Sequence, residues 1–592
     1  MGVGSVYDAR PWLRHYPAEV PASLSYPEIN LARWLEDTAA RHPDRAATVY
    51  FGARLSYAQL RQHVRALAGA LASLGVGRGD RVAIILPNVP QAVIAYYAVL
   101  WLGGVVVMTN PLDTPRELLH QLRDADLRVV VALDLLLPRL AQVASDAGIR
   151  HVIVTSGADF LPAPLRLLYP LRQAAQARRE RRRRGGAHSS GPPPAVRLPE
   201  GVTRHDFRSL LHHPPADGPA PVRAREDVAL LQYTGGTTGT SKGVVLTHFN
   251  LAANCTQIEA WLYKLRGQPT TVLAALPFFH VYGLTTVLNF AVMSGATMVL
   301  MPRFEAREAV KLLQRHRPQL FPGVPTMYVA INALPDVERY RLDSLEACIS
   351  GAAPLPVTVQ ETFERLTGGR LIEGYGLTEA SPVTHSNPIW GRRKAGSIGL
   401  PWPDTEARVV DPASGEPLPP GEVGELAVRG PQVMKGYWRR PEETAAVLKD
   451  GWLLTGDLAR MDEDGYFYIV DRKKDLIIAG GFNIYPREVE DVLYEHPAVK
   501  EAAVVGVEDP YRGETVRAYV VLKEGQTATP DQLEAFCRER LAAYKVPRQY
   551  VFIDELPKTL VGKVLRRALR ESAGSEAQAS GATRSTATGR PA

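Results

Sequence analysis

The hydrophobic positions of residues 30–155 follow two alternating periods. Residues 58–75 (AQLRQHVRALAGALASLG) repeat apolar side chains at helical spacing, and residues 81–86 (RVAIIL) form the short apolar run of a buried strand. Strand patterns of the same kind recur at 297–301 and 348–350. Strands that alternate with helices predict an α/β fold, in which helices cover buried parallel sheets.

The pattern changes from about residue 405 onward. Short strands such as 406–411 (EARVVD) and 465–470 (GYFYIV) are separated by Gly/Pro turns, which predicts a small β subdomain. Further along, a helix at 486–497 precedes strand patterns such as 517–522. This last part is predicted to be an α+β module.

One segment, residues 82–112, carries no charged side chain, and residues 92–108 within it are almost wholly apolar. A membrane span needs about 20 such residues. Pro87 and Pro90 interrupt the start of the segment, and two glycines at 103–104 divide the rest. We therefore predict a buried helix, turn and strand here, with a membrane span as the alternative.

The composition of the chain mainly excludes certain classes of protein and site. With 592 residues, 45% of them hydrophobic and 22% charged, the chain has the make-up of a globular protein of about two to four domains. Its three cysteines lie far apart in the sequence, which favours neither a disulfide framework nor a cysteine metal cluster. A reducing cytoplasm fits this cysteine usage, and the first residues show no secretory signal pattern.

The net charge of +7 is concentrated in residues 178–184 (RRERRRR). Because the excess belongs to one segment rather than to a face, we expect no nucleic-acid partner. Within residues 160–184, Leu165, Leu168 and Tyr169 would share a helical face near the arginines. Peripheral contact with the inner face of the cell membrane is therefore one hypothesis, and a solvated, disordered loop is the alternative.

Residues 233–242 (YTGGTTGTSK) combine three glycines, four threonines, a serine and a lysine without an acidic group. Glycines let backbone N–H groups converge on anionic oxygens, hydroxyls add donors, and Lys242 supplies a positive charge. The loop is not a Walker A loop, because Lys242 lies between Ser241 and Gly243 and residues 244–247 read as a strand. The pattern predicts a polyphosphate-binding loop between two strands.

Two later motifs carry specific chemistry: EGYGLTEASP at 373–382 and TGD at 455–457. A tyrosine in a Gly-rich turn can present its ring to a purine. The neighbouring threonine and glutamate can contact phosphate and hold Mg²⁺, which usually takes one or two carboxylates together with phosphate oxygens. Taken singly, the first motif is also compatible with a plain turn and the second with a helix cap.

Together with PFFHVYGLT, SGAAPL, DRKKDLIIAGGFNIYPREVE and PKTLVGKVLRR, in this order, these motifs closely resemble the adenylate-forming acyl-CoA synthetases. The resemblance covers roughly residues 30–570 and looks closest to bacterial long-chain fatty-acid/CoA ligases. It implies ATP-dependent activation of a fatty acid to an acyl-adenylate with release of pyrophosphate. Transfer to coenzyme A, giving acyl-CoA and AMP, would follow.

The resemblance also implies a domain organisation. The fold class is α/β, with a large N-terminal domain of doubly wound α/β subdomains plus a small β subdomain, and a smaller, mobile C-terminal α+β domain. The expected boundaries are a large domain at 1–470 (with a basic, Pro-rich insertion at 157–224 and the β subdomain at about 400–470), a hinge at 471–474, a C-terminal lid at 475–571, and a disordered tail at 572–592.

Site residues follow from the motifs that match this family. Those implied to bind ATP or AMP are Thr234, Gly235, Gly236, Thr237, Thr238, Gly239, Ser241, Lys242, Gly351, Ala352, Ala353, Glu373, Gly374, Tyr375, Gly376, Asp457 and Arg472. Those implied to act in catalysis are His280, Thr378, Glu379 and Lys563, with Glu379 as the Mg²⁺ ligand. Lys474 would mark the hinge, and Gly480 and Gly481 would contact coenzyme A after the lid has rotated.

Alternatives remain at this stage. The acid could be medium-chain or aromatic, or the acceptor could be a separate carrier protein. A non-catalytic protein that binds membrane or nucleic acid through the arginine run is a remote alternative. The oligomeric state is left open, with a homodimer among the options, and the expected location is the cytoplasm, with or without contact at the cell membrane.

Overall fold

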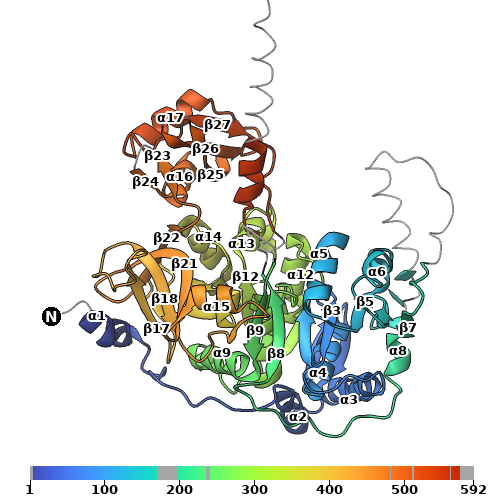
Figure 1. Ribbon diagram of the computed structural model, residues 1–592. Helices are drawn as coiled ribbons and strands as arrows, with labels where there is room; N and C mark the ends of the chain where they lie inside the picture. The colour runs from blue at the N-terminus through green and yellow to red at the C-terminus, as the bar shows by residue number, and fades with distance from the viewer. Residues whose placement is uncertain are drawn as a thin grey trace, which may run out of the picture.

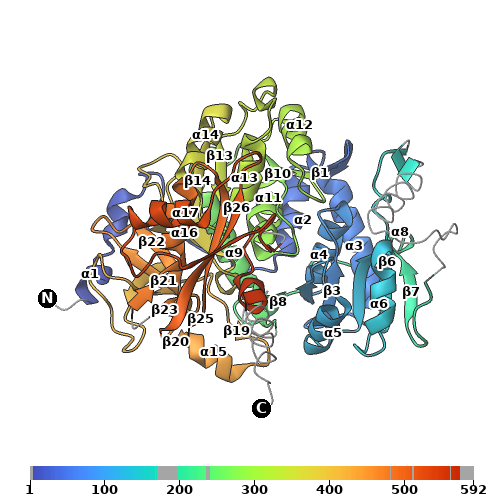
Figure 2. The same ribbon diagram turned by 90° about the horizontal axis from the view of Figure 1, so that it is seen from above.

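Two large sheets form the body of the protein, and a small sheet and a C-terminal module complete it (Figure 1). The computed structural model describes residues 4–163, 165–166, 168–169, 196–234, 241–479, 482–509, 512–559 and 562–573. Within these ranges the expected class is confirmed: mixed α/β sheets build a large N-terminal domain, and a smaller α+β domain follows. In the view from above, the smaller domain covers part of the larger one (Figure 2).

The eight-stranded sheet is parallel in its centre, where β8, β4, β3, β5, β6 and β7 run in the same direction. At one edge β9 and β19 are antiparallel. In spatial order its strands are β19 (Gly436–Tyr437), β9 (Gly243–Thr247), β8 (Val228–Tyr233), β4 (Val105–Met108), β3 (Arg81–Ile85), β5 (Val129–Leu133), β6 (His151–Thr155) and β7 (Thr203–Asp206). The edge strand β7 and the short α8 (Phe207–Leu210) lie inside the stretch predicted as an insertion, so part of that stretch belongs to the sheet.

The nine-stranded sheet has a parallel centre flanked by antiparallel strands at both edges. In spatial order its strands are β16 (Leu400–Pro401), β15 (Val383–Ser386), β14 (Arg370–Gly376), β13 (Ala347–Ser350), β12 (Leu320–Gly323), β10 (Thr271–Ala274), β11 (Thr297–Leu300), β1 (Ala46–Tyr50) and β2 (Ala53–Ser56). The apolar runs at 297–301 and 348–350 are therefore buried strands, as predicted.

Two smaller sheets follow. The antiparallel sheet of the β subdomain contains β17 (Glu406–Val410), β18 (Gly424–Arg429), β21 (Trp452–Met461), β20 (Leu448–Lys449) and β22 (Phe467–Arg472). The C-terminal module contains β24 (Phe482–Ile484), β23 (Ile477–Ala479), β26 (Gly513–Leu522), β25 (Val499–Asp509) and β27 (Gln549–Phe552). Its helices α16 (Pro486–Glu495) and α17 (Pro530–Arg538) contribute Val489, Leu493 and Leu533 to a separate apolar core.

Helices cover the sheets, and several begin at side-chain caps. Ser56 and Thr114 form capping boxes that start α3 (Tyr57–Ser73) and α5 (Pro115–Asp124), and Thr247 caps α9 (His248–Trp261). Further α-helices in the described parts of the chain are α1 (Gly4–Asp8), α2 (Ala32–Arg41), α6 (Leu137–Val143), α10 (Val281–Gly283), α11 (Phe290–Ser294), α12 (Ala306–His316), α13 (Pro325–Asn332), α14 (Val357–Thr367) and α15 (Pro441–Val447), and a π-helical segment (Leu284–Asn289) joins α10 to α11.

The uncharged segment forms a buried helix, turn and strand, as predicted. Every residue of α4 (Pro90–Trp101) is buried, and β4 is buried along its whole length. The two elements are joined through Gly103, whose φ of 69° lies in the left-handed region. Within the described parts of the chain, helices that combine enough length and apolarity to traverse a bilayer are absent.

Asn88 links the two large sheets. It follows β3 of one sheet and is almost wholly buried. Its amide donates hydrogen bonds to the backbone oxygens of Ala274 (2.8 Å) and Leu276 (2.7 Å), and its Oδ1 accepts one from the N–H of Phe278 (2.8 Å). These backbone groups follow β10 of the other sheet, so one side chain fixes the start of the segment that leads to His280.

Replacing Asn88 with alanine should lower the free energy of unfolding by about 3 kcal/mol, because three buried hydrogen bonds are lost and two of the backbone groups, those of Leu276 and Phe278, lose the partner that Asn88 supplies, while the oxygen of Ala274 keeps the N–H of Met301. Urea denaturation followed by fluorescence measures the change. Asn110→Ala is the matched control: Asn110 accepts one bond at a more exposed position, from the N–H of Leu112, and should cost less than about 1 kcal/mol. Equal losses for the two variants would contradict this role of Asn88.

Candidate active site

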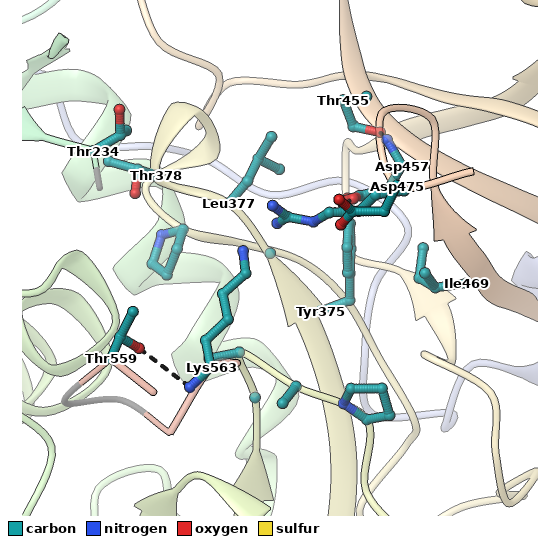
Figure 3. Close-up of a pocket in the computed structure, with 18 of the residues that line it drawn as sticks. Thr234, Tyr375, Leu377, Thr378, Thr455, Asp457, Ile469, Asp475, Thr559 and Lys563 are labelled. Atoms are coloured by element: carbon teal, nitrogen blue, oxygen red, sulfur yellow. Dashed lines mark hydrogen bonds and ion pairs between the residues drawn. The ribbon is translucent and has the colours of Figure 1, made fainter. Parts of the chain in front are cut away.

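A cleft of about 2850 Å³ lies between the large domain and the C-terminal module. Every described residue that the sequence singled out for nucleotide binding, catalysis or the hinge lines this cleft. These residues are Thr234, Ser241, Lys242, His280, Gly351, Ala352, Ala353, Glu373, Gly374, Tyr375, Gly376, Thr378, Glu379, Asp457, Arg472, Lys474 and Lys563. Figure 3 shows the Lys563 side chain extending into the space between Thr378 and Tyr375.

The predicted phosphate loop is held closed at its two ends. Thr234 follows β8, Lys242 precedes β9, and the N–H of Thr234 donates to the backbone oxygen of Lys242 at 3.0 Å. The predicted strand, loop, strand order is therefore confirmed at both ends. The predicted contacts Gly235, Gly236, Thr237, Thr238 and Gly239 lie outside the described residues.

A segment from elsewhere in the chain reaches the loop lysine. Strand β19 pairs with β9, with Tyr437 opposite Val244. The ammonium group of Lys242 forms an ion pair with Glu443 and lies 4.9 Å from the centre of the Tyr437 ring. The Tyr437 hydroxyl in turn donates to Glu379 at 2.8 Å. Tyr437 and Glu443 are functional-site candidates that the sequence reasoning missed.

The two described ends of the loop also contact α5. His120 lies 2.8 Å through Nε2 from the backbone oxygen of Ser241. At the other end of the loop, the Tyr233 hydroxyl donates to the carboxylate of Asp124 at 2.7 Å. Sequence reasoning missed these contacts too, because α5 is far from the loop in the sequence and its histidine and aspartate stand in no recognisable motif.

The ends of β13 and β14 form the part of the cleft assigned to adenine. Gly351, Ala352 and Ala353 follow β13, and Ala352 has a φ of 69°. Glu373 lies on β14 and is buried, and burial raises its carboxyl pKa to about 7, against the lowering effect of Arg487. Arg487 belongs to α16, so this wall of the cleft faces a cation from the C-terminal module.

Three residues join β14 to the small sheet. The Tyr375 hydroxyl donates to the Asp457 carboxylate at 2.6 Å, and the Arg472 guanidinium lies 3.3 Å from the other oxygen of that carboxylate. Asp457 and Arg472 stand opposite each other in the register of β21 and β22. Asp457 is therefore held in place from two directions, with its carboxylate at the cleft.

His280 precedes α10 and caps that helix. Its Nδ1 accepts a hydrogen bond from the N–H of Tyr282 at 3.2 Å. Burial, and then the charge of Lys563, lower the pKa of the imidazole to about 4. At neutral pH the ring is therefore uncharged and its Nδ1 is an acceptor, which leaves the Nε2 proton available to a ligand.

Lys563 reaches the cleft from the C-terminal module. The backbone N–H of Lys563 donates a hydrogen bond to the Thr559 hydroxyl oxygen at 3.1 Å (Figure 3). The backbone oxygen of Lys563 accepts one from the N–H of Thr559 at 2.8 Å. Burial, and then the charge of Arg472, lower the pKa of the Lys563 ammonium group to about 7. The ligand-free cleft thus holds a lysine that is only partly protonated near neutral pH.

Among the residues that the structure describes, no three His, Cys, Asp or Glu side chains gather into a group able to hold a metal ion. Glu379 stands at the cleft with a carboxylate whose Oε1 accepts from Tyr437. A single carboxylate oxygen suits Mg²⁺ that takes its remaining ligands from phosphate and water.

The predicted hinge and coenzyme A residues lie beyond β22. Lys474 lines the cleft, and burial lowers the pKa of its ammonium group. The predicted coenzyme A contacts Gly480 and Gly481 fall outside the described residues, between β23 and β24. The predicted tail at 572–592 does so too, apart from its first two residues.

Comparison with known proteins gives two family matches. The model of the AMP-binding enzyme family matches residues 35–438, and the model of the AMP-binding enzyme C-terminal domain matches residues 488–563. A long-chain-fatty-acid–CoA ligase of Bacillus subtilis (strain 168) is 50% identical over 564 residues, which cover 95% of this chain and 98% of that protein.

Solved structures agree in fold. ATP-bound MatB from Rhodopseudomonas palustris superposes with a TM-score of 0.79 at 31% identity, covering 92% of this chain and 98% of that one. The anthranilate CoA ligase AuaEII in complex with anthranoyl-AMP also has a TM-score of 0.79, at 28% identity, covering 93% of this chain and 99% of that one.

The pKa of Lys563 should respond to its charged neighbours. Lys474 lowers this pKa and Asp457 raises it, so Lys474→Ala should move it above 7 and Asp457→Asn should move it below. The pH dependence of amine acylation at Lys563, followed by peptide mass spectrometry with exposed Lys264 as internal reference, measures both shifts. A midpoint near the ordinary lysine value in the unmodified protein would contradict the effect of burial.

Proposed function

Because the chain belongs to the family of AMP-binding enzymes, we propose that it is a fatty-acid/CoA ligase that acts on long-chain acids. In the first step a carboxylate oxygen attacks the α-phosphorus of ATP, and the bond to the β-phosphate breaks to release pyrophosphate. In the second step the sulfur of coenzyme A attacks the acyl carbon, the carbon–oxygen bond to AMP breaks, and the thiol proton is released.

The observation that carries this proposal is a cleft that gathers cations from both domains around residues suited to a nucleotide. The first step brings two anions together. Two unit charges about 4 Å apart interact by about 4 kcal/mol at an effective dielectric constant near 20, equivalent to roughly a thousandfold in rate. Lys242 from the large domain and Lys563 from the C-terminal module both line the cleft and would offset this repulsion by position and charge.

The proposed roles are those that the matching family motifs imply, and the described residues concerned all line the cleft. Ser241 and Lys242, with Thr234 and residues 235–239, would bind the β- and γ-phosphates. Thr378 would contact the α-phosphate, and Asp457 with Arg472 would hold the ribose hydroxyls. The adenine would lie among Gly351, Ala352, Ala353, Glu373, Gly374, Tyr375 and Gly376. None of these roles requires a nucleophilic side chain, because both attacking groups belong to substrates.

Glu379 is the proposed Mg²⁺ ligand. The bound ion would neutralise charge on the phosphate oxygens during the transfer. The Tyr437 hydroxyl fixes the direction of the Glu379 carboxylate through the hydrogen bond at 2.8 Å. A carboxylate held in this way keeps its second oxygen free to face the phosphates.

His280 and Lys563 would meet the carboxylate of the acid. The uncharged imidazole can donate one hydrogen bond to it without adding charge. Lys563 becomes fully protonated once anions replace water around it, because opposite charge raises the pKa that burial had lowered. Rotation of the lid about the hinge at 471–474, which includes Lys474, would then withdraw Lys563 and bring Gly480 and Gly481 toward coenzyme A.

Two alternatives keep the same cleft and change the substrates. A medium-chain or aromatic acid could replace the long-chain acid, or a separate carrier protein could accept the acyl group. A series of acids of increasing length, assayed with ATP and coenzyme A by AMP release, separates these cases. Activity greatest with aromatic acids, or absent with free coenzyme A, would overturn the proposed assignment.

Lys563→Ala should lose acid-dependent ATP/pyrophosphate exchange by about a hundredfold or more, because the first step loses a buried positive charge. Conversion of supplied acyl-adenylate and coenzyme A to thioester should change little, since the lysine is withdrawn in that step. Lys558→Ala is the control, because Lys558 is paired with Glu501 at 2.7 Å. Equal damage to both half-reactions by Lys563→Ala would refute this role.

We also propose peripheral contact with the cytoplasmic face of the cell membrane through residues 160–184. Leu165 and Leu168 are 40% and 57% exposed, and the basic run that follows lies outside the described residues. Exposed leucines beside arginines suit an anionic lipid surface, where each basic residue contributes about 1 kcal/mol.

Deleting residues 160–190 should lower co-sedimentation with anionic liposomes by about tenfold and leave ATP/pyrophosphate exchange intact. Liposomes of neutral lipid serve as the control, because binding driven by arginines requires anionic headgroups. If the deletion leaves binding to anionic liposomes unchanged, the membrane hypothesis is wrong.

A further inference from the structure

Lys242 does not stand free at the cleft: its charge is already neutralised by a carboxylate of the same chain. The ammonium group forms an ion pair with Glu443, and the two side chains are 37% and 41% exposed. Arg440 lies 3.7 Å from the other oxygen of Glu443, so this carboxylate has a second, weaker partner to which it can turn.

Tyr437 lies between this ion pair and the proposed metal ligand. Its ring centre is 4.9 Å from the Lys242 ammonium group, and its hydroxyl donates to Glu379. The face of an aromatic ring attracts a cation at this distance. The Tyr437 ring therefore offers the Lys242 ammonium group a favourable surface between Glu443 and Glu379.

The position of Glu443 relative to the lysine is fixed by backbone structure. Strand β19 pairs with β9, the strand that begins directly after Lys242. Thr444, next to Glu443, accepts a hydrogen bond from the N–H of Tyr437 at 2.9 Å and donates one to the backbone oxygen of Arg440 at 2.8 Å. The first turn of α15, which carries Glu443, is thus hydrogen-bonded to β19, and β19 pairs with the strand that follows Lys242.

We propose that Glu443 is the resting counter-ion of Lys242, which the β- and γ-phosphates displace when ATP binds and which reclaims the lysine as pyrophosphate leaves. The proposal rests on the proposed function, since it takes Lys242 as a ligand of those phosphates. Glu443 competes with the phosphates for one cation, and its own negative charge repels them. It therefore weakens binding of ATP and pyrophosphate and speeds product release.

Glu443→Gln should lower the dissociation constants of ATP-Mg and of pyrophosphate by about two- to fivefold, the effect typical of a partly exposed ion pair. The affinity for AMP should stay unchanged, because AMP lacks the two phosphates concerned. Titration calorimetry with ATP-Mg, pyrophosphate and AMP measures all three. Glu443→Ala should also lower the dissociation constants of ATP-Mg and of pyrophosphate and leave that of AMP unchanged.

Glu442→Gln is the matched control: it removes an exposed carboxylate from the same first turn of α15 and should leave all three affinities unchanged. In a Lys242→Met background, Glu443→Gln should lose most of its effect on the ATP affinity, because the shared cation is gone. A purely structural role of Glu443 would instead give the same shift in both backgrounds.

Several results would overturn the proposal. Unchanged or weaker binding of ATP and pyrophosphate by Glu443→Gln would mean that Glu443 does not compete for Lys242. A higher Mg²⁺ requirement in this variant would assign Glu443 to the metal instead. If the unmodified protein itself binds neither ATP nor AMP, the proposed function fails rather than this inference alone.

Discussion

Repulsion between a carboxylate and the phosphates of a nucleotide is the constraint to which the rest of this structure responds. Cations must be present where the two meet, yet a permanent cluster of buried cations would be unstable without its ligand. The protein resolves this in two ways. Burial leaves Lys563 with a pKa of about 7, and Lys242 is neutralised by Glu443. In the roles proposed for them, both lysines would therefore act mainly when anions arrive.

The architecture serves this arrangement by bringing distant segments to one cleft. Strands β4 and β8 of one large sheet and β13 and β14 of the other end at the cleft, and Asn88 links the two sheets. The small sheet adds Asp457 and Arg472, and the C-terminal module adds Lys563. Because these groups come from separate units, the cleft is complete only when the units are packed together.

Much of this could be predicted from the sequence, because the signals are local. Strand and helix periods indicated the α/β fold, and the prolines and glycines of 82–112 separated a buried helix from a membrane span. Motifs marked the nucleotide residues, and all of the described ones line a single cleft. Their individual roles remain predictions.

What the sequence could not indicate are pairs formed across long separations. Glu443 and Tyr437 meet Lys242 only because β19 pairs with β9, and His120 reaches Ser241 only because α5 packs beside the loop. Each is an ordinary residue in its local context. The pKa values of Glu373 and Lys563 likewise depend on burial by several elements, which no local pattern encodes.

The hydrogen bond from Tyr375 to Asp457, and the contact of Asp457 with Arg472, tie the nucleotide pocket to the last residues of β22. Lys473, the next residue, still donates its N–H to the backbone oxygen of Gly456 at 3.0 Å, and the predicted hinge ends one residue later. In the proposed mechanism, a nucleotide held by Asp457 would therefore stiffen the residues at which the lid rotates. An inhibitor bound beside Asp457 would then hold the C-terminal module in one orientation without contacting the acyl chain.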